Sequence, residues 1–183
     1  MERIIQPNQQ VLKIALVGAE STGKTTLAQQ LAAHYDTLWV PEFAREYIAN
    51  LSRPYTLEDI EQIAQQHQLN IKREYQHARK YLFVDTEMII LKVWCQEKFH
   101  SIPQSISDHL LHQQYDLYLV LENDLPWVAD SVRENPDKRD YLKTLYLAEL
   151  EKLNALYFTV SGIGKERLQK IIEELDFFEC ELD

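Results

Sequence analysis

The chain has 183 residues, 45% of them apolar, and a formal net charge of −10. Its length predicts one domain over residues 1–183 whose core needs no disulfide or metal, and its negative charge argues against a nucleic-acid partner. The two cysteines, Cys95 and Cys180, form no Cys-x-x-Cys pattern, and no window is apolar enough for a signal peptide or a membrane span. We therefore expect a cytoplasmic protein with reduced thiols.

The first predicted strand, residues 11–17, leads into Gly-Ala-Glu-Ser-Thr-Gly-Lys-Thr, which is a phosphate-binding loop. Apolar residues at helical spacing from Leu27 to Ala32 predict a helix directly behind it, which is the context that this motif needs. In such loops the backbone N–H groups surround a β-phosphate, Lys24 reaches the β- and γ-oxygens, and the Thr25 hydroxyl holds Mg²⁺. We assign nucleotide contacts here to Gly18, Glu20, Ser21, Thr22, Gly23, Lys24, Thr25 and Thr26.

A short buried strand is predicted over residues 37–40, and functional side chains gather at such strand ends in open parallel sheets. Glu42 is a candidate for orienting an acceptor hydroxyl or accepting its proton; the alternative is a solvated carboxylate at a helix start. Arg45, one helical turn away, is a candidate substrate contact or a simple ion-pair partner of Glu42. The aromatic candidates for stacking on an acceptor are Phe43, Tyr47, Trp94 and Trp127; the alternative for each is ordinary core or rim packing.

A long helix is predicted from Thr56 onward, with an apolar face that includes His67. We interpret His67 as a packed histidine rather than a metal ligand. The next apolar strand, residues 81–84, ends in Asp85, and a helix is predicted over residues 88–99. Because Asp85 then lies beside the phosphate loop, we expect it to act through Mg²⁺ or its water shell and to approach the acceptor.

The rest of the chain continues the alternation of strands and helices. The predicted elements are a helix over 105–114, a strand over 117–121, a charged lid over about 122–140, a helix over 141–156, a strand over 157–160 and a terminal helix around 168–175. Together they predict an α/β fold of the P-loop NTPase type, with a mostly parallel five-stranded sheet between layers of helices.

The lid contributes basic candidates. Arg133 and Arg139 can close over the phosphates, and the alternative for each is an ordinary solvated charge. Gly162, just after the last strand, is a candidate adenine contact or a plain turn. A kinase must position an acceptor, neutralise developing charge and exclude water. The candidate catalytic residues are Lys24, Glu42, Asp85 and Arg133, and the candidate metal ligands are Thr25 and Asp85.

Other phosphate-loop classes fit the sequence less well. The Asn-Lys-x-Asp signature that reads guanine is absent, which argues against a GTPase. The strand that ends in Phe-Val-Asp-Thr-Glu at residues 83–87 lacks the adjacent Asp-Glu pair that is common in ATP-driven motors. A small-molecule kinase is therefore the favoured class.

The chain resembles the ribosylnicotinamide kinase domain of NadR-type NAD biosynthesis proteins over almost its whole length. Four stretches carry the resemblance: GAESTGKTTL at 18–27, EFAREY at 42–47, FVDTE at 83–87 followed by Trp94 and Cys95, and WVADSVR at 127–133. The resemblance implies ATP and Mg²⁺ as cofactors and phosphorylation of the 5′-hydroxyl of nicotinamide riboside to nicotinamide mononucleotide. It also implies phosphate and metal contacts for Lys24 and Thr25, a Walker B-like role for Asp85, riboside contacts for Glu42 and Arg45, and a lid role for Arg133.

The lid departs from the family pattern Trp-x-Asp-Asp-Gly-x-Arg, because Ala129 and Ser131 replace the first acid and the glycine. Lid flexibility or substrate preference is therefore expected to differ. Two alternatives stay open: a kinase for another nucleoside or small metabolite, and a non-catalytic ATP-binding regulatory module. We expect a small-molecule substrate and ATP as partners, without nucleic acid or membrane. The oligomeric state, the choice between Glu42 and Asp85 as base, and the preference for ATP are left open.

Overall fold

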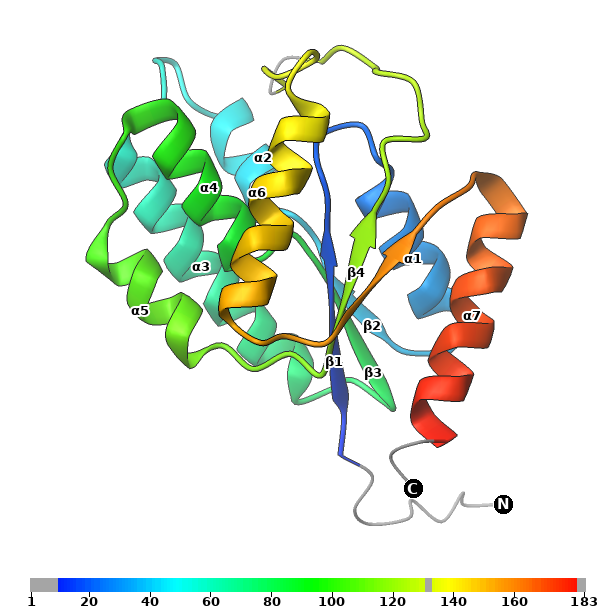
Figure 1. Cartoon of the computed structure of the whole chain (residues 1–183). Helices are drawn as coiled ribbons and strands as arrows, with labels where there is room; N and C mark the ends of the chain where they lie inside the picture. The colour runs from blue at the N-terminus through cyan, green and yellow to red at the C-terminus, as the bar shows by residue number, and fades with distance from the viewer. Residues whose placement is uncertain (1–9, 131–132, 181–183) are drawn as a thin grey trace.

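The computed structural model describes residues 10–130 and 133–180 of the chain. At its centre lies a five-stranded sheet with the strand order β2-β3-β1-β4-β5 (Figure 1). Every neighbouring pair of strands is parallel. The strands are β1 (Leu12–Val17), β2 (Leu38–Val40), β3 (Tyr81–Asp85), β4 (Leu117–Leu121) and β5 (Tyr157–Val160). The predicted α/β fold of the P-loop NTPase type is confirmed, with an entirely parallel sheet.

Helices cover both faces of the sheet (Figure 1). Ile14 and Leu16 of β1 pack toward α1 (Lys24–His34) and α7 (Gly164–Cys180). Ala15 and Val17, which point the opposite way, join the larger cluster on the other face. That face is covered by α2 (Phe43–Ala49), α3 (Leu57–Tyr75), α4 (Met88–Phe99), α5 (Gln104–His112) and α6 (Arg139–Lys152). Alternate residues of a strand point to opposite faces, so a strand covered on both sides is apolar throughout.

The helix expected over residues 141–156 is displaced toward the N-terminus. It spans Arg139–Lys152, and Asn154 beyond it adopts a φ of 49°, which a continuing helix does not allow. The apolar pattern continues past the helix end because Leu153 and Ala155 pack against the core from the following turn. The spacing of apolar residues indicates which side chains are buried and not whether the backbone is helical. The prediction therefore placed the helix end beyond the observed one.

The topology places two functional segments side by side. β1 pairs directly with β3, with Leu16 opposite Asp85. The phosphate loop that leaves β1 therefore begins next to the turn that leaves β3. The segment after β4 passes over the carboxyl ends of these strands before it enters α6 (Figure 1). Within the described ranges, no helix is both long and apolar enough to cross a membrane.

Candidate functional site

The phosphate loop is a tightly fixed turn between β1 and α1. Gly23 has a φ of 85°, which favours glycine, and a Cβ added there would lie 2.9 Å from Leu125 Cδ1, so the Leu125 side chain would have to shift. Thr22 is buried, and its Oγ1 donates to the carbonyl oxygen of Ala19 at 2.8 Å. The start of α1 thus presents its backbone N–H groups in the manner that suits a bound phosphate.

Lys24 folds back over its own loop. Its Nζ donates to the carbonyl oxygens of Gly18 at 2.8 Å and Ala19 at 3.1 Å. These contacts hold the ammonium above the loop, where phosphate oxygens are stronger partners than neutral carbonyls. Lys24 is therefore held ready to bind an anionic ligand over the loop.

Asp85 and Thr25 form the buried floor of the site. Thr25 Oγ1 donates to Asp85 Oδ2 at 2.5 Å, and Asp85 is 0% exposed. Burial raises the pKa of Asp85 to about 6; Lys24 opposes this rise and the Glu42 carboxylate adds to it. Asp85 Oδ1 is buried and has no hydrogen-bond partner within the described chain. An unpartnered carboxylate oxygen beside a hydroxyl suits Mg²⁺, which prefers oxygen ligands and takes few from the protein when phosphates supply the others.

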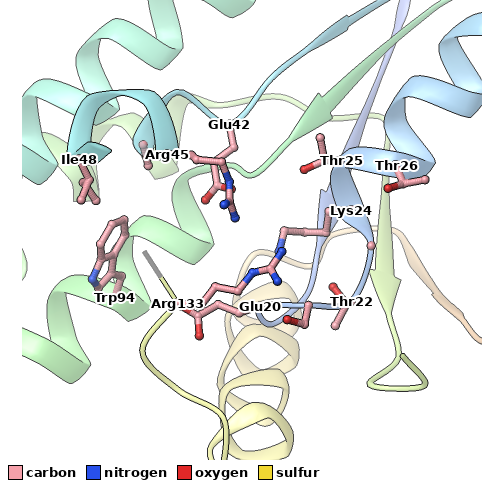
Figure 2. Close-up of a pocket in the computed structure, with 13 residues that line it drawn as sticks. Glu20, Thr22, Lys24, Thr25, Thr26, Glu42, Arg45, Ile48, Trp94 and Arg133 are labelled. Carbon is pink, nitrogen blue, oxygen red and sulfur yellow. The ribbon is translucent and has the colours of Figure 1, made fainter. Parts of the chain in front are cut away.

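A charged cluster connects α2 with the lid. Asp130 Oδ2 lies 2.7 Å from Arg45 Nη1 and 3.1 Å from Arg133 Nε. Arg45 Nε also lies 4.0 Å from Glu42 Oε2. Glu42, Arg45, Arg133 and Lys24 point into one space beside Thr25 (Figure 2). Asp130 therefore holds two guanidinium groups at the mouth of this space.

The segment after β4 is docked on the phosphate loop itself. The Glu20 carboxylate accepts backbone hydrogen bonds from Glu134 at 3.1 Å and Asn135 at 2.9 Å. Ser21 Oγ donates to the Val128 carbonyl at 3.3 Å and accepts from the Val128 amide at 3.2 Å. Two side chains of the phosphate loop thus hold the segment after β4 against the loop.

Two adjoining cavities open at this edge. The first, about 120 Å³, lies over the phosphate loop and reaches Glu42, Arg45 and Arg133. The second, about 290 Å³, extends away from the loop. Glu20, Lys24, Glu42 and Trp94 line both cavities. One end of the combined space is therefore bounded by the phosphate loop, and the other end is the larger of the two.

The sequence interpretation missed most of the second cavity. Its further lining residues are Gly18, Tyr55, Ile90, Glu97, Lys98, Glu134, Asn135, Lys138, Leu142 and Tyr146, of which only Gly18 was assigned to the site. Trp94 Nε1 donates to the Tyr55 hydroxyl at 3.0 Å, and Lys98 Nζ lies 4.1 Å from the Tyr55 ring centroid. The Tyr55 hydroxyl in turn donates to Glu134 Oε2 at 2.9 Å. This network joins α4 to the lid.

The predicted residues divide into two groups. Those that line the cavities are Gly18, Glu20, Ser21, Thr22, Gly23, Lys24, Thr25, Thr26, Glu42, Arg45, Trp94 and Arg133, and Asp85 joins them through Thr25. The others line neither cavity and have no contact of this kind: Phe43, Tyr47, Trp127, Arg139 and Gly162. Ser131 lies outside the described residues, and Ala129, although described, lines neither cavity.

Contacts elsewhere account for four of the five residues in the second group. Phe43 and Tyr47, four residues apart on α2, share a face that lines a different hollow, and the Tyr47 hydroxyl donates to Asp59. Arg139 Nη1 donates to the Leu125 carbonyl at 2.9 Å. The Gly162 amide, at a φ of 92°, donates to Asp124. Arg139 and Gly162 thus bind the segment that follows β4.

The sequence offered no signal for the contact that Arg167 makes with the phosphate loop. This arginine of α7 is 4% exposed, and its Nη1 donates to the Thr22 carbonyl at 2.8 Å. An added Cβ at Gly23 would lie 3.5 Å from the same nitrogen. Arg167 therefore supports the phosphate loop from behind.

A family model described as an AAA domain matches residues 13–167. The trifunctional NAD biosynthesis/regulator protein NadR of Escherichia coli (strain K12) is 29% identical over 162 residues, which cover 82% of this chain and 38% of the relative. A crystal structure of NadR protein in complex with NR is 21% identical with a TM-score of 0.78, covering 91% of this chain and 51% of that one. NadR protein in complex with NAD and AMP-PNP is 20% identical with a TM-score of 0.75, covering 90% and 48%.

These similarities confirm the P-loop kinase fold and the resemblance to NadR-type proteins that the four sequence stretches indicated. The chain spans 38% of the length of the NadR relative and 51% of the NadR structure with NR. The correspondence therefore concerns one part of those proteins.

Proposed function

This chain belongs to the AAA domain family, and we propose that it is an ATP-dependent kinase that phosphorylates the 5′-hydroxyl of nicotinamide riboside to give nicotinamide mononucleotide. One observation carries the proposal: the cavity over the phosphate loop adjoins a larger cavity, and Lys24, Glu42 and Trp94 line both. A phosphoryl donor and an acceptor of riboside size can thus meet beside Lys24 and Glu42.

The donor side of the proposal rests on the phosphate loop. Its backbone, Lys24 and the arginines at the cavity mouth supply positive charge to a protein whose net charge is −10. The NadR protein of similar fold was crystallised with the ATP analogue AMP-PNP, which supports ATP as the donor here. The start of α1 and Lys24 would hold the β- and γ-phosphates.

The acceptor side rests on the second cavity. Trp94, Tyr55 and Tyr146 give it aromatic walls, and the carboxylates of Glu97 and Glu134 line it in ion pairs with Lys138 and Lys98. Nicotinamide riboside carries a flat, positively charged pyridinium ring, which aromatic faces and carboxylates favour. The NadR protein in complex with NR, which we take as nicotinamide riboside, supports this acceptor.

The residues then divide the chemistry among themselves. Glu42 lies at the junction of the cavities, where it would accept a hydrogen bond from the 5′-hydroxyl and take up its proton as the oxygen attacks the γ-phosphorus. The bond from the γ-phosphorus to the bridging oxygen of ADP breaks in the same step. Lys24 and Arg133 would stabilise the charge on the transferring group, while the closed lid keeps out water that would otherwise hydrolyse ATP.

Thr25 and Asp85 are the residues that would hold Mg²⁺, which would neutralise phosphate charge when bound. Asp85 is engaged with Thr25 in the floor of the site, whereas Glu42 faces both cavities. We therefore assign the role of base to Glu42 and that of metal ligand to Asp85.

The test is ADP release from Mg·ATP with nicotinamide riboside, set beside adenosine, deoxycytidine, uridine, thiamine and no acceptor. Release that depends on the riboside and falls at least about a thousandfold in Lys24→Ala supports the proposal. Lys152→Ala is the matched control, because Lys152 lines neither cavity and its exposed side chain pairs with Glu149. ADP release that depends on another acceptor would assign that molecule as the substrate instead. Tight ATP binding without acceptor-dependent release would instead favour a regulatory module.

A further inference from the structure

The turn between β3 and α4 contains an unusual backbone conformation. Thr86, the residue after Asp85, has a φ of 72°. A β-branched residue rarely adopts this left-handed conformation, because its side chain crowds the backbone there. Strain of this kind persists only where surrounding contacts enforce it, and it gathers at functional sites.

A histidine from another helix supplies one such contact. His67 of α3 is 2% exposed, and its Nε2 lies 2.7 Å from the Thr86 carbonyl oxygen. A carbonyl oxygen only accepts hydrogen bonds, so Nε2 carries the proton and donates it. Burial lowers the pKa of His67, which keeps the ring neutral. The tautomer is thereby fixed as the one that can hold Thr86.

The other side of the turn is fixed by Glu87. Its Oε2 accepts from the Ile89 amide at 2.9 Å, which caps α4, and from Gln113 Nε2 at 2.9 Å. The strained Thr86 therefore lies between a capped helix start and the His67 contact. Rotation of this residue would move Asp85, whose carboxylate lies at the end of β3 against Thr25.

We propose that His67 is a positioning residue for the phosphate site: its hydrogen bond to the Thr86 carbonyl holds the strained turn and so keeps Asp85 aligned with Thr25. The inference rests on the proposed function for its catalytic consequence only. Without the donor, Thr86 would relax toward negative φ, and the Asp85 carboxylate would leave its place against Thr25, where the two residues would hold Mg²⁺.

Four variants separate this role from simple packing. His67→Leu removes the donor but keeps an apolar side chain of similar size in the core. His67→Gln keeps an amide Nε2 that reaches the same carbonyl. Thr86→Gly adopts the observed φ without strain, and the double variant His67→Leu/Thr86→Gly no longer needs the donor.

The first readout is the Mg²⁺ concentration needed for half-maximal binding of a fluorescent ATP analogue, and the second is kcat with the best acceptor. We expect His67→Leu to raise the Mg²⁺ requirement about tenfold and to lower kcat by a similar factor, with KM for the acceptor unchanged. His67→Gln and the double variant should return to within about threefold of the parent protein. The binding readout stands even if no tested acceptor is phosphorylated, so failure of the proposed function is distinguishable from failure of this inference.

Two results would overturn the inference. One is a His67→Leu protein that melts earlier but keeps the parent Mg²⁺ requirement, because His67 would then only pack. The other is a loss that neither Gln at 67 nor Gly at 86 restores, because the effect would then not pass through the Thr86 carbonyl. If His67→Leu does not fold, His67→Asn replaces it, since its shorter amide cannot reach that oxygen.

Discussion

Replacing Asp85 with asparagine should stabilise the metal-free protein while removing its activity. The carboxyl is buried, and its pKa rises from an ordinary value of 3.8 to about 6. The native state therefore holds this proton more tightly than the unfolded chain does. The contribution of the group to stability is complete below the unfolded pKa, near 4, and is lost as the pH rises through about 6. Asparagine keeps the shape and a hydrogen-bond acceptor for Thr25 but has no charge to bury.

The size of the effect follows from the shift. About two pKa units at about 1.4 kcal/mol each give about 3 kcal/mol for ionised Asp85 at pH 8. The shift already includes the opposing attraction to Lys24, and asparagine does not reproduce every contact of the protonated carboxyl, so we expect Asp85→Asn to be more stable by about 1–3 kcal/mol at pH 8. Because ionisation begins near the unfolded pKa, the advantage should grow by about 2 kcal/mol between pH 4.5 and pH 8.

Urea unfolding in EDTA, without nucleotide, measures this difference. Asp36→Asn is the matched control, because the side chain of Asp36 is 87% exposed and its replacement should change stability by less than about 0.5 kcal/mol at either pH. The reasoning fails if Asp85→Asn is less stable than the parent at pH 8, or if its advantage does not depend on pH. Activity of the variant in Mg·ATP should be lost in either case.

Three further substitutions probe the loop, the lid and the second cavity. Gly23→Ala forces a left-handed alanine against Leu125, which should cost about 1–2 kcal/mol, lower Tm by several degrees and raise KM for ATP; an unchanged Tm would contradict this. Glu20→Ala removes the acceptor for two lid amides and should speed proteolytic cleavage of residues 122–138 several-fold, whereas equal cleavage would show that Glu20 does not hold the lid. Trp94→Ala should raise KM for the acceptor about tenfold and leave the affinity for ATP within a few-fold, and the reverse pattern would place Trp94 on the donor side.

The parts of the site that the sequence predicted are local. The phosphate loop is one continuous motif, Asp85 is the last residue of β3, and Glu42 lies two residues beyond β2, so strand order alone brings them to the same end of the sheet. The expectation that functional side chains lie at strand ends identified the residues but not the directions in which their side chains point. On α2 it could not tell that Arg45 faces the cavity while Phe43 and Tyr47 point to another hollow.

The second cavity and the support of the loop were not predictable in this way. Tyr55, Lys98 and Glu134 come from three separate segments, and their contacts depend on how the lid crosses the sheet edge. Tyr146 belongs to an apolar helical pattern that reads as core, and it is indeed buried. Arg167 contacts Thr22, which lies 145 residues away in the sequence, and no local sequence pattern predicts such a contact.

The most direct test of the central claim is the ³¹P NMR spectrum of the product formed from nicotinamide riboside and Mg·ATP. The account predicts a phosphomonoester signal split by the two protons of the 5′-carbon, appearing together with an equal amount of ADP. ADP accompanied only by inorganic phosphate would contradict phosphoryl transfer to the riboside and would leave the protein an ATPase or a nucleotide-binding module.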